Sequence, residues 1–307
     1  MVTDSSSFFN PEISINSGQM FQWHKINDSW YGVYGDHILK FSFRKRSSYS
    51  ECHSPEYGDF EFYSYPELEK WDSRLFRLDD DIEKILSGFS HDALVSEAIR
   101  EYPGLRLLRQ EPHQCMFSFV CANNTSITMI RRMLTNLSRK FGSKVIYDGK
   151  EFFTFPTANT LHRATLSEIC TCGLGYRSTS IKALAKSLVR EELDVKHLMR
   201  SPYEHAKQHL MEIHGIGNKI ADCILLFSLE KLEAFPIDIW ITRALFNYYV
   251  WLNQNKDNET IRYNRDKITP KQYTQISETI RKYFGKYAGY AQQFLFYHMR
   301  EEVGREW

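Results

Sequence analysis

A lysine and an aspartate follow a glycine-containing turn between two predicted helices. The turn contains Gly215 and Gly217, the lysine is Lys219, and Asp238 comes nineteen residues later. Apolar helical patterns predict that one helix ends near His214 and that the next begins near Lys219. Glycines permit a tight turn with positive φ, and free N–H groups at a helix start suit a phosphate. The helix dipole and partial burial would lower the pKa of Lys219 and make its amine nucleophilic.

Each of these residues also has an ordinary structural explanation. A Gly-x-Gly turn can join two helices without binding a ligand, and Lys219 can be a solvated surface lysine. Asp238, which follows Pro236, can be the N-cap of a further helix. For any one residue the structural explanation is the commoner case. The hairpin, lysine, proline and aspartate in this order are much harder to obtain by accident, so together they indicate chemistry.

Two pairs of residues could contact a ligand. In each pair the residues are four positions apart, so both would lie on the same face of a helix. Cys223 lies four residues after Lys219, where its thiol could line a pocket or be an ordinary buried cysteine. Gln292 and Phe296 form the second pair. An amide that hydrogen-bonds beside a ring that stacks could recognise a flat heterocycle. The alternative places Phe296 in the core with Gln292 at its rim.

Length and composition allow one large domain or two closely packed domains. The chain has 307 residues and a net charge of +1, so composition alone gives no support for nucleic acid binding. No 18-residue apolar run and no signal peptide are present, which predicts an intracellular protein without a membrane span. In a eukaryote we expect the nucleus, and otherwise the cytoplasm or nucleoid. The six cysteines are scattered and form no four-cysteine iron–sulfur motif.

The distribution of strand and helix patterns predicts an α+β fold with a boundary near residue 110. Residues 1–110 are expected to form an antiparallel β-rich domain, and residues 111–307 a mainly helical domain. Strands rich in aromatic and β-branched residues are predicted around Ile13 and Ile15 and at 30–34, 38–43 and 60–65. A helical pattern begins after residues 79–81 and is broken at Pro103.

Local signals predict several elements in the second part of the chain. Helices are expected at 113–121, 126–140 and 287–302, and a type I′ hairpin at 144–155 turns on Asp148 and Gly149. Capping boxes are predicted to begin at Thr165, Ser201 and Thr269. Polar loops are predicted at 44–48 and 252–267.

Six segments, in this order, resemble the eukaryotic-type 8-oxoguanine DNA glycosylase/lyase family of the helix-hairpin-helix superfamily. They are residues 17–23, 107–112, 116–124, 173–177, the hairpin itself and residues 287–292. The resemblance extends over nearly the whole chain. It implies a bifunctional enzyme with Lys219 as the nucleophile and Asp238 as the essential acid. It also implies a monomer that acts on duplex DNA containing 8-oxoguanine and needs no redox cofactor and no catalytic metal.

The resemblance also assigns residues to the damaged base. 8-Oxoguanine differs from guanine by a carbonyl at C8 and a hydrogen on N7. The backbone carbonyl of Gly18 would accept the N7–H, and a facing acceptor left unpaired by guanine costs roughly 1–3 kcal/mol. Phe296 and Cys223 would sandwich the base, and Gln292 would bond its Watson–Crick edge.

Further residues would contact the DNA from which the base is extruded. The resemblance makes Asn124 the residue that fills the vacated space, Tyr176 a wedge and Arg177 a reader of the orphaned cytosine. The amides of Gly215 and Gly217 would hold a backbone phosphate. The structural alternatives are a helix cap for Asn124 and packing for Tyr176.

Two positions depart from the family pattern. Met129 stands where the cytosine-discriminating relative has arginine, and methionine cannot donate to a base edge, which predicts a weak preference for the opposite base. Trp240 stands where that relative has a histidine that contacts phosphate, so this DNA contact would survive only in altered form.

Two other functions compete with this interpretation. A glycosylase of the same superfamily that removes alkylated bases generally lacks the hairpin lysine, so Lys219 argues against it. A hairpin protein that only binds DNA would keep the glycines but would not need Lys219, Asp238, Gly18 and the Gln292–Phe296 pair together.

Overall fold

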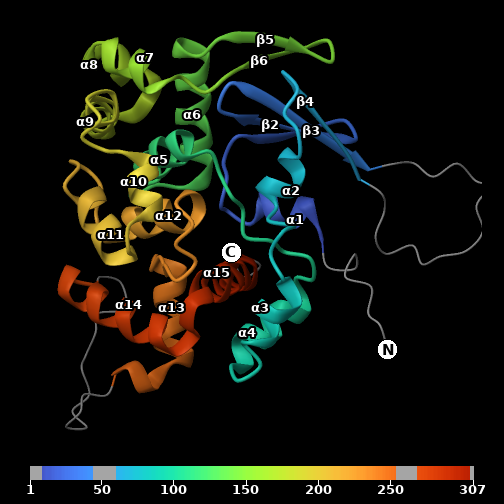
Figure 1. The fold of residues 1–307 in the computed structure, drawn as a ribbon, viewed down its shortest axis with the longest axis vertical. Coiled ribbons are helices and arrows are strands. Elements are labelled where there is room, and N and C mark those ends of the chain that lie inside the picture. The colour runs from blue at the N-terminus through green and yellow to red at the C-terminus, as the bar shows by residue number, and fades with distance from the viewer. Residues whose placement is uncertain (1–8, 44–59, 254–267, 305–307) are drawn as a thin grey trace, which may run out of the picture.

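The structure of the protein is a computed structural model that describes residues 9–43, 60–253 and 268–304. Strands gather in the first part of the chain and helices form most of the rest, as Figure 1 shows, so the predicted α+β class is confirmed. The division at residue 110 stays a prediction. The predicted loop at 44–48 and most of the one at 252–267 lie outside the described residues. No helix within the described ranges is long and apolar enough to cross a membrane.

A four-stranded antiparallel sheet opens the fold. Its strands are β1 (Trp23–Ile26), β2 (Ser29–Tyr34), β3 (His37–Phe43) and β4 (Phe60–Tyr65), which pair in sequence order. The last three were predicted, whereas β1 was missed. Trp23 packs flat on β2 at Gly32, where an added Cβ would lie 2.4 Å from the indole. Aromatic rings therefore form the core on this face of the sheet.

The strand predicted around Ile13 and Ile15 is wrong, because Pro11–Asn16 is the helix α1. Asn10 is its N-cap and accepts a hydrogen bond from the Ile13 N–H at 3.0 Å. Pro11 occupies the first turn, where its missing N–H costs nothing. These local start signals outweigh the alternation of two isoleucines.

Helices make up most of the remaining described chain. After α2 (Trp71–Leu75), which was missed, the bounds are α3 (Ile82–Ser87), α4 (Ala93–Glu101), α5 (Pro112–Cys121), α6 (Ile127–Phe141), α7 (Ala158–Arg163), α8 (Leu166–Ile169), η2 (Cys170–Leu174), α9 (Arg177–Val189), α10 (Val195–Arg200), α11 (Tyr203–Met211), α12 (Asn218–Ser228), α13 (Ile239–Tyr248), η3 (Val250–Asn253), α14 (Pro270–Phe284), η4 (Gly285–Tyr287) and α15 (Ala288–Gly304). The largest buried apolar cluster includes both α5 and α12. The helices predicted at 113–121, 126–140 and 287–302 correspond to α5, α6 and α15.

Most predicted turn and cap signals are also found in the structure. Strands β5 (Lys144–Tyr147) and β6 (Lys150–Phe153) form the hairpin, with φ of +54° at Asp148 and +69° at Gly149, as a type I′ turn requires. The capping boxes at Thr165 and Thr269 are confirmed. The box at Ser201 is wrong, because its hydroxyl donates back to the His197 carbonyl and α11 has no side-chain cap.

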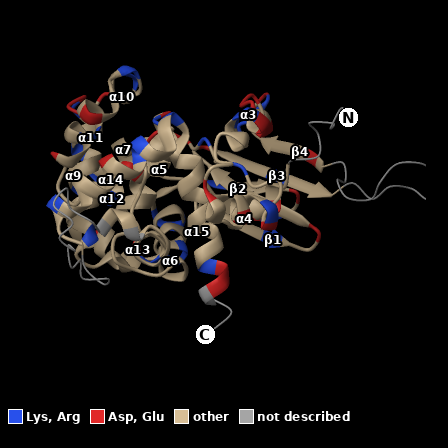
Figure 2. Ribbon diagram, turned by 90° about the horizontal axis from the view of Figure 1, so that it is seen from below, with Lys and Arg blue, Asp and Glu red and all other residues tan. Residues whose placement is uncertain are grey.

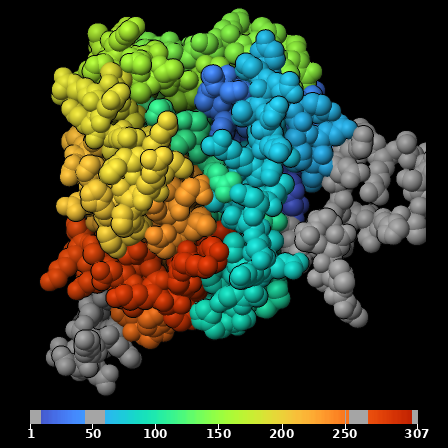
Figure 3. Space-filling view, in the orientation of Figure 1, coloured from blue at the N-terminus to red at the C-terminus, as the bar shows by residue number. Residues whose placement is uncertain are grey.

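The N-terminal part and the C-terminal helices share a continuous boundary. In Figure 3 residues 60–110, in cyan, lie directly against the orange and red helices α12–α15. Across this boundary the Gln110 N–H donates to the Phe227 carbonyl of α12 at 2.8 Å. Figure 2 shows basic and acidic residues side by side at the C-terminal end of α15 and on α3. Residues of opposite charge are therefore intermixed at these two places.

Candidate active site

The helical hairpin predicted around the two glycines is present, although its glycines differ from one another. Helix α11 ends at Met211 and α12 begins at Asn218, close to the predicted limits. Gly215 has φ +92°, and a Cβ there would lie 2.0 Å from the Ser180 Oγ of α9, so only glycine fits. Gly217 has extended backbone with φ −98°, so the positive φ predicted there is wrong. Its exposed position at the N-cap of α12 leaves the first N–H groups without a capping side chain.

A cavity of about 730 Å³ opens beside this hairpin. Its walls include these residues that the sequence singled out: Gly18, Asn124, Lys219, Cys223, Asp238, Trp240, Gln292 and Phe296. Four other candidates, Tyr176, Arg177, Gly215 and Gly217, lie outside its lining. Residues more than 270 positions apart therefore meet in one space.

Lys219 and Asp238 line the cavity from the N-terminal ends of two helices. Lys219 is half-buried in the first turn of α12. Asp238 is the N-cap of α13, and its Oδ1 accepts a hydrogen bond from the Ile241 N–H at 2.9 Å. The cap interpretation and the cavity position both hold, because this bond uses only one carboxylate oxygen. Among the described ion pairs none joins Lys219 to Asp238.

Burial dominates the electrostatics of the Asp238 carboxyl. It raises the pKa of Asp238 above the usual value, although the Ile241 N–H and the positive charge of Lys219 act in the opposite direction. Burial also raises the pKa of Cys223 to about 12, again opposed by the Lys219 charge. Cys223 is therefore a neutral thiol near pH 7 and serves as a wall rather than as a nucleophile.

A buried polar network behind this wall connects the two catalytic candidates. Asp222, fully buried in α12, pairs with Lys207 at 3.0 Å and accepts from the hydroxyls of Tyr203 and Tyr273 at 2.5 and 2.7 Å. The Tyr273 hydroxyl in turn accepts the N–H of Ile237 at 3.0 Å. The segment that carries Asp238 is thus tied to the helix that carries Lys219. Burial raises the pKa of Asp222, while the charge of Lys207 lowers it.

Another part of the cavity lining offers hydrogen-bonding groups and a ring. Gln292 is 4% exposed, and its Nε2 donates to the Pro236 carbonyl at 3.1 Å, whereas its buried Oε1 has no hydrogen-bond partner among the residues that the structure describes. A buried acceptor of this kind is left for a ligand that donates. Gly18 has φ +85°, and a Cβ there would lie 2.8 Å from Cε1 of Phe296. Both the backbone conformation and the ring require glycine at this position.

The segment after α5 meets the loop before α9 at the rim of the cavity. Asn124 has φ +49° and lies between the end of α5 and the Ser126 cap of α6, so its cap interpretation is wrong. Arg177 donates from Nε to the Asn123 carbonyl at 3.0 Å and from Nη2 to that of Asn124 at 3.1 Å. Tyr176 is 60% exposed, which excludes core packing, and its ring lies 4.5 Å from the guanidinium of Arg177. These three of the predicted DNA-contacting residues are therefore neighbours.

Comparison with known proteins identifies the family. Residues 1–116 match the model described as the 8-oxoguanine DNA glycosylase N-terminal domain. Residues 117–271 match the model of the HhH-GPD superfamily of base excision DNA repair proteins. The chain belongs to this superfamily.

Individual relatives agree with the family models. A probable N-glycosylase/DNA lyase of Methanothermobacter thermautotrophicus is 30% identical over 246 residues, which are 74% of this chain and 73% of that protein. The N-glycosylase/DNA lyase of Saccharomyces cerevisiae is 32% identical over 75% of this chain and 65% of its own length. The 8-oxoguanine glycosylase/lyase of Clostridium acetobutylicum, solved with double-stranded DNA containing cytosine opposite 8-oxoguanine, is 28% identical. It superposes with a TM-score of 0.80 over 97% of this chain and 93% of its own.

The two departures from the glycosylase pattern occupy different surroundings. Met129 is 41% exposed on α6. Trp240 lies on the cavity wall in the first turn of α13, with the guanidinium of Arg243 4.9 Å from its ring. A neighbouring arginine thus supplies positive charge beside the tryptophan.

Sequence reasoning missed several residues of this glycosylase site. Arg300, Gln293, Phe21, Phe119 and Phe227 also line the cavity. A signal for Arg300 existed, because it follows Phe296 by four residues and Gln292 by eight on one helix face. Phe119 and Phe227 stack with ring centroids 5.4 Å apart on α5 and α12, a contact that no local pattern reveals.

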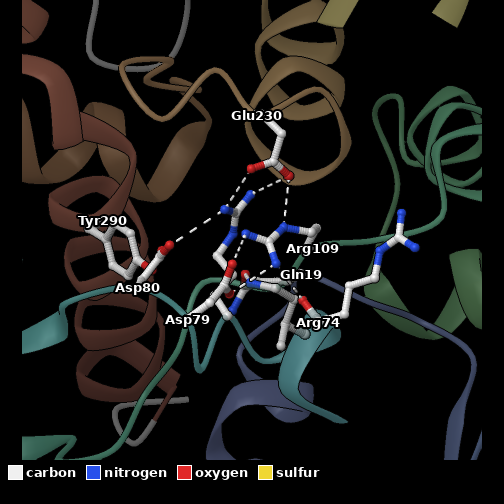
Figure 4. Close-up of polar contacts among 9 residues, drawn as sticks. Gln19, Arg74, Asp79, Asp80, Arg109, Glu230 and Tyr290 are labelled. Atoms are coloured by element: carbon white, nitrogen blue, oxygen red, sulfur yellow. Dashed lines mark hydrogen bonds and ion pairs between the residues drawn. The ribbon is translucent and has the colours of Figure 1, made fainter. Parts of the chain in front are cut away.

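A second missed feature is an ionic network that joins the N-terminal part to the end of α12. Glu230 accepts two hydrogen bonds from the fully buried Arg77, at 2.9 and 3.0 Å. Figure 4 shows that the Glu230 carboxylate also accepts a hydrogen bond from Arg109, which forms an ion pair with Asp79. A side-chain link runs in parallel, since the Gln110 Nε2 donates to the backbone carbonyl of Gln19 at 2.7 Å. The residue next to Gly18 is therefore fixed relative to α12, the helix that carries Lys219 in its first turn.

Proposed function

We propose that this chain is a bifunctional DNA glycosylase/AP lyase that excises 8-oxoguanine from duplex DNA in base excision repair. The observation that supports this proposal most directly is that Lys219 and Asp238 line one cavity with Gln292 and Phe296. An amine, a carboxylate, an unpaired acceptor and an aromatic ring are the groups that this reaction needs. The presence of both family models and of relatives named N-glycosylase/DNA lyase supports the same conclusion.

The chemistry follows from the positions of the two charged groups. After the damaged nucleotide leaves the helical stack, the free amine of Lys219 attacks C1′ of its sugar. The C1′–N9 bond breaks and positive charge develops on the sugar, where the Asp238 carboxylate stabilises it. A Schiff base forms, and β-elimination then cuts the strand 3′ to the lesion. No redox cofactor and no catalytic metal enters this sequence of steps.

Base recognition would use the part of the lining that contains Gly18, Gln292 and Phe296. The free Oε1 of Gln292 is suited to the N–H donors on the Watson–Crick edge of a guanine-type base, because its Nε2 is already engaged with Pro236. The half-buried Phe296 ring and the neutral Cys223 thiol would hold the two faces of the base. The carbonyl of Gly18 would accept the N7–H that only the oxidised base carries. Guanine would leave that acceptor unpaired, at a cost of roughly 1–3 kcal/mol.

For contacts to the remaining DNA we propose the roles that the family resemblance implies. Asn124 would fill the space left by the base, Tyr176 would wedge the stack and Arg177 would read the orphaned cytosine. The amides near Gly215 and Gly217 would bind a backbone phosphate at the start of α12. We also propose that the enzyme acts as a monomer inside the cell, where its DNA substrate is found.

Lys219→Gln tests the nucleophile. We expect loss of borohydride trapping and of strand cutting on a duplex with 8-oxoguanine opposite cytosine, with lesion binding retained, since the amine is the only group removed. Lys282→Gln is the matched control, because Lys282 is exposed on α14. Covalent trapping that persists in the Lys219 variant would refute the assignment.

A substrate panel separates the proposed activity from its rivals. The wild-type protein is incubated with duplexes that carry 8-oxoguanine, an alkylated purine or no lesion. Excision of the alkylated purine without strand cutting would support the alkylated-base function. Binding with no excision of any base would support a protein that only binds DNA.

A further inference from the structure

Arg300 places a guanidinium in the wall of the cavity. It follows Phe296 by one helical turn on α15, is 18% exposed, and lies 5.7 Å from the centroid of the Phe296 ring. Its Nε and Nη2 donate to Oε1 of Glu301 at 3.2 and 2.9 Å, and Nη2 also donates to the Asn16 carbonyl at 2.8 Å. These three bonds fix the plane of the guanidinium.

The remaining nitrogen, Nη1, points to Gly18. A Cβ built on Gly18 would lie 2.9 Å from Nη1, so this donor is immediately beside the Gly18 backbone. Within the described residues Nη1 makes no hydrogen bond, whereas the other two nitrogens are engaged. A positively charged donor thus stands next to the Gly18 backbone in the lining of the cavity that Lys219 also lines.

We propose that Nη1 of Arg300 donates a hydrogen bond to the C8 carbonyl oxygen of the extruded base and is a specificity-determining residue. This inference rests on the proposed excision of 8-oxoguanine. On that base the N7–H donor and the C8 carbonyl acceptor are adjacent, and the wall offers the complementary pair, the Gly18 carbonyl and the Arg300 N–H. Guanine can satisfy the guanidinium through N7 but cannot then donate to Gly18, so only the oxidised base satisfies both groups.

The same contact helps the base to leave. When the C1′–N9 bond breaks, its electron pair remains on the base, and the negative charge spreads onto the carbonyl oxygens. A fixed guanidinium at the C8 oxygen stabilises that charge more strongly in the transition state than in the ground state. Arg300 should therefore affect the rate of base release and not only the binding of the lesion.

Arg300→Met tests the proposal, because methionine keeps much of the length and removes the charge and the donors. A charged hydrogen bond of ordinary strength predicts a fall in single-turnover excision of 8-oxoguanine of roughly 10- to 100-fold. Cutting and borohydride trapping at a preformed abasic site, which holds no base, should stay at the wild-type level. Arg300→Lys should restore part of the excision rate, since it keeps a charge without the planar guanidinium.

Arg100→Met is the matched control, since Arg100 is exposed on α4 and does not line the cavity. Unchanged excision by Arg300→Met would overturn the proposal. So would an equal loss of activity at the abasic site, because it would mean that Arg300 holds the fold or the DNA rather than the base.

A binding measurement separates this inference from the proposed function. If the wild type excises no 8-oxoguanine, the proposed function has failed, and Arg300 is then tested by affinity alone. In the Lys219→Gln background, adding Arg300→Met should lower the ratio of affinities for 8-oxoguanine and guanine duplexes. An unchanged ratio would refute the contact with the C8 oxygen.

Discussion

The two walls of the cavity are built in different ways. The hairpin wall carries Lys219, Cys223 and Asp238, all within residues 219–238, and is held from behind by the buried Asp222 network. The recognition wall joins Gly18, from the start of the chain, to α15 near its end. The first wall is a local unit with a charged core, whereas the second exists only when two distant segments are packed together.

The attachments of the recognition wall show this difference in detail. Gln293 donates to the Ser17 carbonyl at 3.0 Å, and Arg300 donates to that of Asn16 at 2.8 Å. Both bonds bring side chains of α15 to the backbone beside Gly18. The comparison teaches that nucleophile placement depends on a few buried charges, while base selection depends on side-chain bonds to a distant backbone.

The largest expected effect would show whether charges hold the hairpin wall. Asp222→Ala leaves the ammonium of Lys207 buried without its partner, so the free energy of unfolding should fall by about 3–5 kcal/mol. Denaturant unfolding measures this, with Glu278→Ala, an exposed acid on α14, as the control. Base excision and abasic-site cutting should fall together in the remaining folded protein. Normal stability in the Asp222 variant would contradict the role given to the network.

An intermediate effect is expected on the recognition wall. Gly18→Ala adds a Cβ where φ is +85° and displaces the Phe296 ring and the Arg300 guanidinium, so excision of 8-oxoguanine should fall by up to about 100-fold. Abasic-site cutting should change little, because the hairpin wall is untouched. Single-turnover kinetics on the two substrates measure this difference.

Gly149→Ala is the control for backbone strain alone. Gly149 also has positive φ, at +69°, but nothing lies within 4 Å of an added Cβ. It should therefore share the cost in stability without the loss of excision. If the two alanine variants lose excision equally, strain rather than crowding of the base explains the effect at Gly18.

The smallest effect is expected outside both walls. Met129 is exposed on α6 and has no group that can donate to a base, so replacing cytosine opposite the lesion by adenine, guanine or thymine should change excision only a few-fold. Met129→Arg should increase the preference for cytosine. Excision rates on the four matched duplexes measure both expectations. A strong cytosine preference in the wild type would refute the first of them.

Prediction from the sequence succeeded where the signal is local. The hairpin around Gly215, the cap at Asp238 and the turn at Asp148 are each specified by residues within a few positions of one another. It failed at α1, where two alternating isoleucines were given more weight than the Asn10 cap and Pro11. It also failed at Ser201, because the hydroxyl had a closer acceptor in the turn behind it.

The residues of the site show the same difference between local signals and long-range contacts. Cys223 follows from helical spacing after Lys219, and Phe296 follows from spacing after Gln292. Neither spacing says that these two pairs face the same space, or that Glu230 draws Arg77 and Arg109 to the end of α12. Lys219 and Phe296 are 77 residues apart and Glu230 is 121 residues from Arg109, and no period in the sequence encodes contacts over such separations.

The sequence by itself determined the chemical groups of this glycosylase and the short elements that carry them, because turns, caps and helix faces depend on neighbouring residues. Only the tertiary structure decided that Gly18 stands against Phe296 and Arg300, and that these residues line the same cavity as Lys219. The physical reason is that burial and long-range hydrogen bonds, rather than local backbone preference, fix the distance between the two walls.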